Sequence, residues 1–352
     1  MIFTAVSESQ SSRKKLIPKD RDLSLETLRG IAILLVVMLH SVNSDAGDSY
    51  HYFTFSFAYL MMPLFTAISG YVYAFRPVQP DNWKNFLVIK TQRILLPLIS
   101  VSTVQYFVSA LLAGHSISGW WKIYIFGYAQ FWFLQSLALV FLTIAALERF
   151  RALNSLNVML MLIVLTSLVR IFVPELNIEA LDGFLYILPY FLWGCSLRRF
   201  SAQLQNRVVI LMMTGTAVVG IFMQHLAKGG IFEIRLDTNG PLASVVGLAL
   251  VYIFFRWRRN VTPLSFLGKY SYSIYLFHAF GVSAGERLTR LISPLYSYSY
   301  WPQFVMKILC GVVFAICAEK VLSKMSLTQF VFLGIKPKRH HPEIDSAVSE
   351  GK

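Results

Sequence analysis

The chain has 352 residues, of which 56% are hydrophobic and only 14% are charged. Soluble domains contain about 25% charged residues, so this chain has too few of them to cover a water-facing surface. The composition therefore excludes the soluble two-domain protein that the length alone suggests, and it favours an integral membrane protein. The formal net charge of +14 is typical of nucleic-acid binding in a soluble protein, but in a membrane protein it reports orientation.

Ten apolar stretches are long enough, together with their polar flanks, to form membrane-spanning helices. A helix that crosses about 30 Å of hydrocarbon needs about 20 largely apolar residues. The stretches lack the two-residue alternation of β-barrel strands. In chain order the predicted helices are 31–42, 52–75, 94–112, 131–147, 156–173, 184–197, 208–226, 242–255, 270–284 and 304–322. The sequence thus predicts an all-α integral membrane protein, a polytopic bundle of about ten transmembrane helices.

The distribution of Lys and Arg predicts the orientation of this bundle. If the chain crosses ten times, 25 basic residues lie on the side of the termini and 7 on the other side. Cytoplasmic loops are enriched in Lys and Arg, so both termini are predicted to be cytoplasmic. The positive excess then meets anionic lipid, and no nucleic-acid partner is expected. Polar tails at 1–22 and 336–352 are predicted to flank a transmembrane domain at 23–335.

His40 and His278 lie within predicted helices, and ionisable residues inside a bilayer are usually functional. His40 follows Arg29 by eleven residues, which puts it about 16 Å deeper on nearly the same helix face. His278 follows Lys269 by nine residues, which puts it about 13 Å deeper. Two imidazoles at similar depth indicate a shared polar cavity, where a neutral histidine takes a proton from a hydroxyl group. A structural hydrogen bond to a neighbouring helix is the alternative for each histidine.

The second predicted helix combines a proline with small residues. Pro63 is expected to kink the helix, because proline lacks a backbone donor. Ser69 and Gly70 allow close helix packing, and a substrate-facing role is the alternative. A metal centre is not predicted, because catalytic zinc needs three protein ligands and the ten stretches contain a single carboxylate, Glu319.

Basic and aromatic residues mark the two ends of the next helices. Lys90 and Arg93 share a face at the cytoplasmic mouth of the third predicted helix. Such residues are ordinarily topogenic or lipid-facing, and they also match what the phosphates of a cytosolic cofactor require. Trp132 lies just inside the outer end of the fourth predicted helix, where tryptophan usually anchors a helix at the membrane interface.

Six blocks of sequence occur in a fixed order: LRGIAILLVVMLH, PLFTAISGY, KTQRILLP, FWFLQSLALV, LPYFLWG and YSYSIYLFH. Together they resemble membrane acyltransferase family 3, the bacterial O-acyltransferases that modify surface polysaccharides and related glycans. The specific part is an arginine and a histidine separated by ten residues and followed by the other five blocks. The chain ends about 30 residues after the last predicted helix, so it resembles the stand-alone members of the family.

The resemblance implies transfer of an acyl group, commonly acetyl, from cytosolic acyl-CoA to a sugar hydroxyl of a cell-surface polysaccharide or glycolipid. It also implies a multi-pass location in the bacterial cytoplasmic (inner) membrane. In the family the essential arginine and histidine match Arg29 and His40. The basic pair before the third helix matches Lys90 and Arg93, with lysine where arginine is often found, which keeps the charge but removes bidentate phosphate binding.

The mechanism expected from these residues starts with acetyl-CoA, a co-substrate rather than a permanently bound cofactor, at the inner mouth against Lys90, Arg93 and Arg29. His40 then acts as the general base on the acceptor hydroxyl or accepts the acetyl group transiently. The remaining candidates are supporting residues: His278 and Tyr275 for the acceptor or the oxyanion, Ser69 for orienting His40, and Trp132 for substrate binding. The expected partners are acyl-CoA, a glycan or lipid-linked sugar acceptor and membrane lipids.

Two other functions fit the same sequence features. A transporter or flippase for a glycan or its lipid carrier also uses intramembrane histidines and kinked helices. Such transporters often contain internal repeats in hydropathy, and the two halves of this chain show none. A non-catalytic scaffold in a surface-polysaccharide complex is the third possibility. The acceptor sugar, the side of transfer and the oligomeric state are open at this point.

Overall fold

The computed structural model describes residues 22–42, 57–114, 116–173, 176–229, 231, 240–292 and 300–336. Every regular element in these ranges is helical. The predicted polar tails lie almost entirely outside the described residues, as does the first part of the predicted helix at 52–75. The all-α fold predicted from the apolar stretches is confirmed for the part of the chain that is described.

Long helices occupy the positions of the predicted stretches. They are α1 (Leu23–Ser41), α3 (Met61–Tyr73), α4 (Trp83–Ala113), α5 (Trp132–Arg149), α6 (Leu156–Phe172), α7 (Glu179–Arg199), α9 (Arg207–Lys228), α10 (Pro241–Trp257), α12 (Ser271–Ile292) and α13 (Tyr300–Leu322). Short helices and 3₁₀ turns join them: α8 (Ser201–Leu204), α11 (Thr262–Lys269), α14 (Ser326–Leu333), η2 (Pro80–Asn82), η3 (Trp120–Tyr124), η4 (Ala129–Phe131) and η5 (Ala152–Asn154). Within the described ranges, five helices are long and apolar enough to cross a membrane, or six if the bent pair α10 and α11 forms one span. The structure thus supports a multi-pass membrane protein, and the number of ten crossings stays a prediction.

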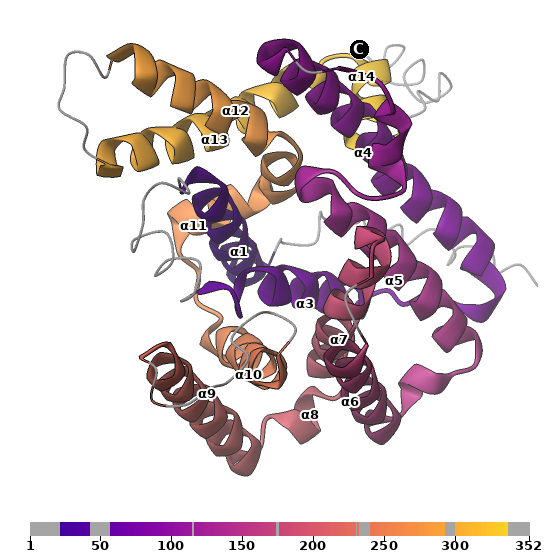
Figure 1. Ribbon diagram of the computed structural model, residues 1–352. Coiled ribbons are helices and arrows are strands. Elements are labelled where there is room, and N and C mark those ends of the chain that lie inside the picture. The colour runs from indigo at the N-terminus through magenta and orange to yellow at the C-terminus, as the bar shows by residue number, and fades with distance from the viewer. Residues whose placement is uncertain are drawn as a thin grey trace, which may run out of the picture.

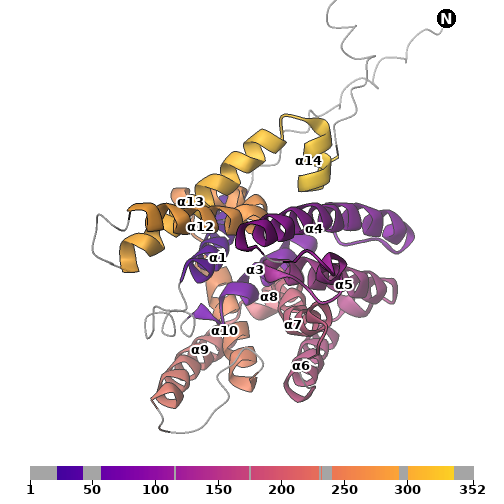
Figure 2. The same cartoon turned by 45° about the horizontal axis from the view of Figure 1, so that its top comes forward.

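The helices are arranged around α1 and α3. Helix α1 packs against α3, α11, α12 and α13, and α3 packs against α7 and α10. Figure 2 shows α1 and α3 near the centre, with α12 and α13, α4, α5, α7 with α6, and α10 with α9 placed around them. The chain returns through α12 beside α1 (Figure 1), so the helices that contain His278 and His40 lie side by side.

Helices α3 and α7 cross at very short distance because both have glycine at the contact. A Cβ atom at Gly70 would overlap the carbonyl oxygen of Phe191, and one at Gly194 would overlap that of Ala67. Small residues at helix contacts let backbones approach closely in membranes. The close-packing interpretation of Gly70 is therefore confirmed.

Gly194→Ala is expected to destabilise the fold, because a methyl group in a packed helix contact costs about 1–3 kcal/mol. The matched control is Gly215→Ala, since a Cβ at Gly215 in α9 meets nothing within 4 Å. Thermal unfolding of both purified variants in detergent measures the difference. The apparent Tm should fall for Gly194→Ala and stay level or rise for Gly215→Ala, because alanine is the better helix former. Equal Tm values for the two variants would contradict the close crossing.

The helix ends on one side of the molecule are joined by pairs involving basic residues. Asp22, which caps α1, pairs with Arg258 after α10 at 2.9 Å. Glu148 at the end of α5 pairs with Arg199 at the end of α7 and accepts a hydrogen bond from Tyr73 of α3 at 3.0 Å. We call this side the basic end, and the side where α1 ends and α3, α5 and α7 begin the opposite end.

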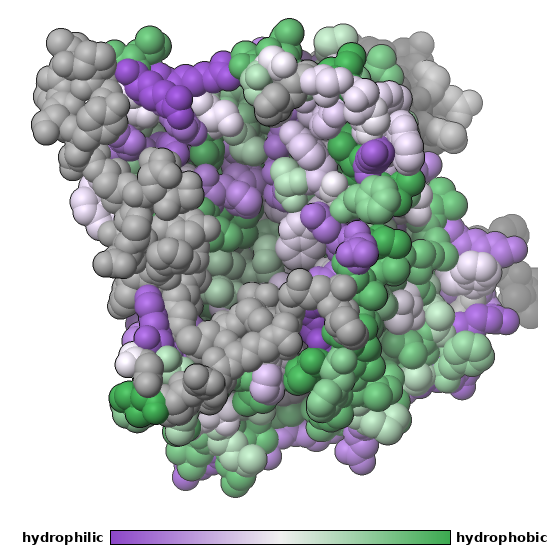
Figure 3. Space-filling model, in the orientation of Figure 1, coloured by the Kyte–Doolittle hydropathy of each residue, from purple (hydrophilic) through white to green (hydrophobic). Residues whose placement is uncertain are grey.

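The outer faces of the helices carry apolar side chains, as expected for contact with lipid. Helix α9 is the clearest case, because only 17% of its most apolar 18-residue segment is buried inside the molecule. Its exposed residues include Val208, Leu211, Met212, Val218, Val219 and Phe222. Figure 3 shows apolar side chains predominating over α5, α6 and α7 as well.

Two local predictions are wrong. Pro63 does not kink α3, because the helix begins at Met61 and Pro63 lies in its first turn, where a backbone donor has no helical partner. Lys269 and His278 do not share a helix, because Lys269 ends α11 and Tyr270 separates it from α12. The depth of His278 therefore depends on the packing of α12 rather than on its spacing from Lys269.

Candidate active site

The structure brings the two membrane histidines together. His40 lies in the last turn of α1 and His278 lies in α12, and their ring centroids are 5.0 Å apart. The His278 side chain is fully buried, whereas His40 is exposed. The shared location predicted for the two imidazoles is therefore observed, and of the two only His40 is exposed.

The hydrogen bonds of His278 determine which of its nitrogens carries the proton. Nδ1 lies 2.9 Å from the backbone oxygens of Ile274 and Tyr275. Carbonyl oxygens only accept, so Nδ1 of the neutral ring donates and Nε2 has the free lone pair. Nε2 is buried and has no hydrogen-bond partner among the described residues. An acceptor nitrogen is thus held beside the ring of His40.

An aromatic and amide cluster supports this pair from α12. The hydroxyl of Tyr275 donates to the backbone oxygen of Gln130, so it is engaged in fixing α12 to the turn before α5. The Tyr275 ring packs against Phe65 and Phe133, at centroid distances of 6.1 and 5.6 Å. The side chain of Gln130 donates to Gln105 of α4 at 2.9 Å. The two glutamines were not recognised in the sequence, where nothing relates them across 25 residues.

Arg29 lies at the basic end, far along α1 from His40. Its guanidinium pairs with Glu26, one turn earlier, at 2.8 Å, and its side chain is partly exposed. The next residue, Gly30, packs directly on the backbone of Leu264 in α11, which holds this part of α1 in place. The structure thus puts a fixed, partly exposed cation at the basic end, while its role in catalysis stays a prediction.

Lys90 and Arg93 differ in their surroundings. The Lys90 ammonium lies over the rings of Phe141 at 4.3 Å and Phe86 at 5.5 Å, and the residue is half-buried. Arg93 is exposed, and its backbone oxygen accepts a hydrogen bond from Tyr272 of α12 at 2.7 Å. Arg93 is therefore the member of the pair that an anionic group in solution reaches directly.

Ser69 lies on the face of α3 that continues from Phe65. Its hydroxyl donates to the backbone oxygen of Phe65, one turn earlier, at 3.1 Å, and the residue is half-buried. Phe65 in turn packs on Tyr275. Ser69 is therefore linked to the histidine pair through an aromatic neighbour, and its predicted role in orienting His40 is not decided by these contacts.

A cavity of about 660 Å³ opens at the opposite end, near the end of α1. Leu39 lines it from α1, Trp132 from α5, Arg170 from α6, and Glu179 and Asp182 from the first turn of α7. Its other lining residues are Ala58, Met61, Met62, Ala129, Leu176, Gly183 and Tyr186. The structure thus places Trp132 in a cavity wall together with charged residues that the sequence did not single out.

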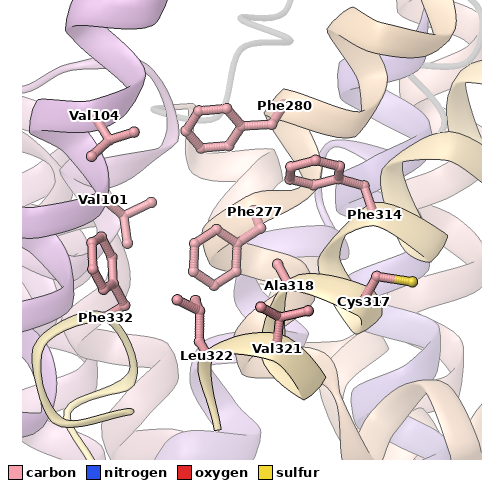
Figure 4. A pocket seen from close by; sticks show the side chains of 10 residues that line it. All are labelled: Val101, Val104, Phe277, Phe280, Phe314, Cys317, Ala318, Val321, Leu322 and Phe332. Atoms are coloured by element: carbon pink, nitrogen blue, oxygen red, sulfur yellow. The ribbon is translucent and has the colours of Figure 1, made fainter. Parts of the chain in front are cut away.

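A second cavity of about 410 Å³ lies between α4, α12, α13 and α14. Its walls are apolar, and Figure 4 shows the rings of Phe277, Phe280, Phe314 and Phe332 around the space. Phe277 directly precedes His278 in α12. Such a lining suits hydrocarbon but offers no hydrogen bonds to a sugar or a phosphate.

The fold and site define a helical, multi-pass membrane protein with a paired-histidine centre between its central helices. A family model described as an acyltransferase domain matches residues 22–320, which includes His40, Arg29, Arg93 and His278. The chain therefore belongs to membrane acyltransferase family 3 and is an acyltransferase. The comparison with curated proteins gives no match.

Proposed function

We propose that this protein is an O-acyltransferase of the bacterial inner membrane. It transfers an acetyl group from cytosolic acetyl-CoA to a sugar hydroxyl of a cell-surface polysaccharide or glycolipid. The observation that carries the proposal is the exposed His40 imidazole beside the buried, proton-accepting Nε2 of His278. A base of this kind is what the attack of a weakly acidic hydroxyl on a thioester requires.

In the proposed reaction His40 removes the proton of the sugar hydroxyl as the oxygen attacks the thioester carbonyl carbon. The carbon–sulfur bond then breaks, the acetyl group stays on the sugar oxygen, and the CoA thiolate takes up the proton that His40 accepted. His278 lies too deep to touch the sugar and positions the His40 ring instead. The assignment of His40 as the base rests on exposure, the property in which the two histidines differ.

The donor is proposed to bind at the basic end, where the polyanionic part of CoA meets cationic side chains. Arg93 and Arg29 are the accessible candidates there, because the Lys90 ammonium is already packed on two phenyl rings. Charge-assisted hydrogen bonds from a guanidinium to phosphate are among the stronger polar contacts in proteins. The pantetheine arm is then proposed to extend along the central helices toward His40.

Arg93→Ala is expected to raise the KM for acetyl-CoA about tenfold, the effect of losing one charge-assisted contact to phosphate. The KM for the acceptor should not change, because Arg93 lies at the other end of the molecule from the cavity beside His40. Lys84→Ala is the matched control, since Lys84 is an exposed cation near the start of the same helix. Steady-state kinetics in nanodiscs measure both constants. An unchanged KM for acetyl-CoA would place the donor elsewhere.

The proposed activity is tested with the purified full-length protein in nanodiscs. Radiolabelled acetyl-CoA is supplied with the glycan of a strain that lacks the gene, and label in the glycan is measured. Incorporation that requires the protein supports the proposal. Movement of the glycan across the membrane of proteoliposomes without acyl-CoA would instead support a transporter, and neither activity would favour a scaffold.

A further inference from the structure

The cavity beside His40 contains a charged pair in an otherwise apolar and aromatic wall. Arg170 of α6 forms an ion pair with Asp182 of α7, and its side chain is only 8% exposed. The guanidinium also lies over the ring of Tyr186, at 5.9 Å from the centroid. Glu179, one turn before Asp182, is exposed at the rim. Fixed polar groups and aromatic walls together are characteristic of a small-molecule site.

Trp132 is held flat against this wall by the fold. A Cβ at Gly183 of α7 would overlap the Trp132 ring, so glycine at that position lets the indole pack across the helix. The ring lies 6.5 Å from that of Tyr186, and Trp132 is half-buried and lines the cavity. A pyranose has one apolar face of C–H groups and an edge of hydroxyl groups. The apolar C–H face can stack on the Trp132 ring. The hydroxyl edge can form hydrogen bonds with Asp182, Glu179 and Arg170.

The lining of the cavity also includes chain neighbours of two residues at the histidine pair. Leu39, which lines it, precedes His40 in α1. Ala129, which also lines it, precedes Gln130, the residue whose backbone oxygen binds Tyr275. The cavity and the exposed imidazole of His40 therefore lie at the same end of α1.

We propose that this cavity is the acceptor site and that it binds a neutral sugar unit, stacked on Trp132 and hydrogen-bonded by Asp182, Glu179 and Arg170. The proposal rests on the acyl-transfer function proposed above and adds the location and charge class of the acceptor. Charge selects against acidic sugars, because Arg170 is neutralised by Asp182 and Glu179 leaves the lining with a net negative charge. A uronic acid brings a second carboxylate close to Glu179, which is unfavourable in a partly desolvated site.

The first experiment separates acceptor binding from the donor half-reaction. Trp132→Ala is expected to raise the acceptor KM about tenfold with little change in kcat, because stacking contributes to binding rather than to the chemical step. The KM for acetyl-CoA should stay as in the wild type. Trp132→Phe should restore much of the affinity, and Trp121→Ala, an exposed tryptophan in η3, is the control.

Three outcomes would overturn the acceptor site. One is an unchanged acceptor KM in Trp132→Ala, and another is an equal loss of acetyl-CoA affinity, which would point to a general structural effect. The third is a loss in Trp121→Ala as large as that in Trp132→Ala. If the wild type itself shows no acetyl transfer, the proposed function fails instead, and the two failures are distinguishable.

The second experiment tests the charge class. A methyl glucoside and the corresponding glucuronide are compared as inhibitors of acetyl transfer to the glycan, since they differ by one carboxylate. The glucoside should inhibit at lower concentration, and Glu179→Gln should reduce the difference between them. Asp81→Asn, an exposed carboxylate at the basic end, is the control. Equal or stronger inhibition by the glucuronide, or no inhibition by either compound, would overturn the neutral-sugar assignment.

Discussion

His40→Ala is expected to lower kcat for acetyl transfer by about 10²–10⁴-fold, the usual contribution of a positioned general base. Both KM values should change little, because the imidazole acts on the reacting proton rather than on binding. The fold should persist, since His40 is exposed and lies at the end of α1. Single-turnover transfer of labelled acetyl to the glycan measures the chemical step, and thermal unfolding in detergent reports the fold.

The matched control for this substitution is His225→Ala. His225 is also an exposed histidine near the end of a helix, and its Nδ1 lies 2.8 Å from the backbone oxygen of Ile221. Helix α9 presents mostly lipid-facing side chains, so its histidine should have no effect on transfer. A rate in His40→Ala close to that of His225→Ala would refute the assignment of His40 as the base.

The positions of the helices were largely predictable from the sequence. Each stretch that crosses a bilayer must satisfy its backbone internally and present apolar side chains, so composition alone marks the helix. The same cost makes an ionisable residue in such a stretch conspicuous, which is how His40 and His278 were found. Their approach to 5.0 Å was expected only in general terms, because depth along a helix says nothing about which helices are neighbours.

The polar lining of the acceptor cavity was not predictable in the same way. Asp182 lies just before the apolar stretch at 184–197, and helix α7 begins earlier than that stretch. In the sequence Arg170 is one basic residue near the end of a predicted helix. Its pairing with Asp182 arises only from the packing of α6 on α7. Contacts of this kind are made between helices, and only the packing of the bundle determines them.

Arg29 illustrates a local contact that the sequence did contain. Glu26 lies three residues before Arg29, a spacing at which side chains on a helix are neighbours. The resemblance to the family drew attention to the spacing from Arg29 to His40 instead. In the structure Glu26 and Arg29 form an ion pair. Arg29 and His40 lie apart, one at the basic end and the other in the histidine pair.

His278 provides the second test with a large expected effect, because its structural and positioning roles use different nitrogens. Nδ1 donates to the carbonyl oxygens of α12, whereas Nε2 is buried without a hydrogen-bond partner among the described residues, in a ring whose centroid lies 5.0 Å from that of His40. In His278→Asn the side-chain amide replaces the Nδ1 donor but nothing replaces Nε2. In His278→Gln the amide reaches the position of Nε2 instead. His278→Asn therefore keeps the hydrogen bond to α12 and loses the group at Nε2, whereas His278→Gln does the reverse.

If His278 positions His40, His278→Asn should lower kcat by up to about 10²-fold, the effect of misplacing a catalytic group, with unchanged KM values. His278→Gln should retain more activity than His278→Asn, although it loses the donor to α12. A purely structural histidine predicts the reverse order, with asparagine tolerated and glutamine less stable. Measuring kcat and Tm for both variants decides between these orders, because only a positioning role depends on the group that replaces Nε2 near the ring of His40.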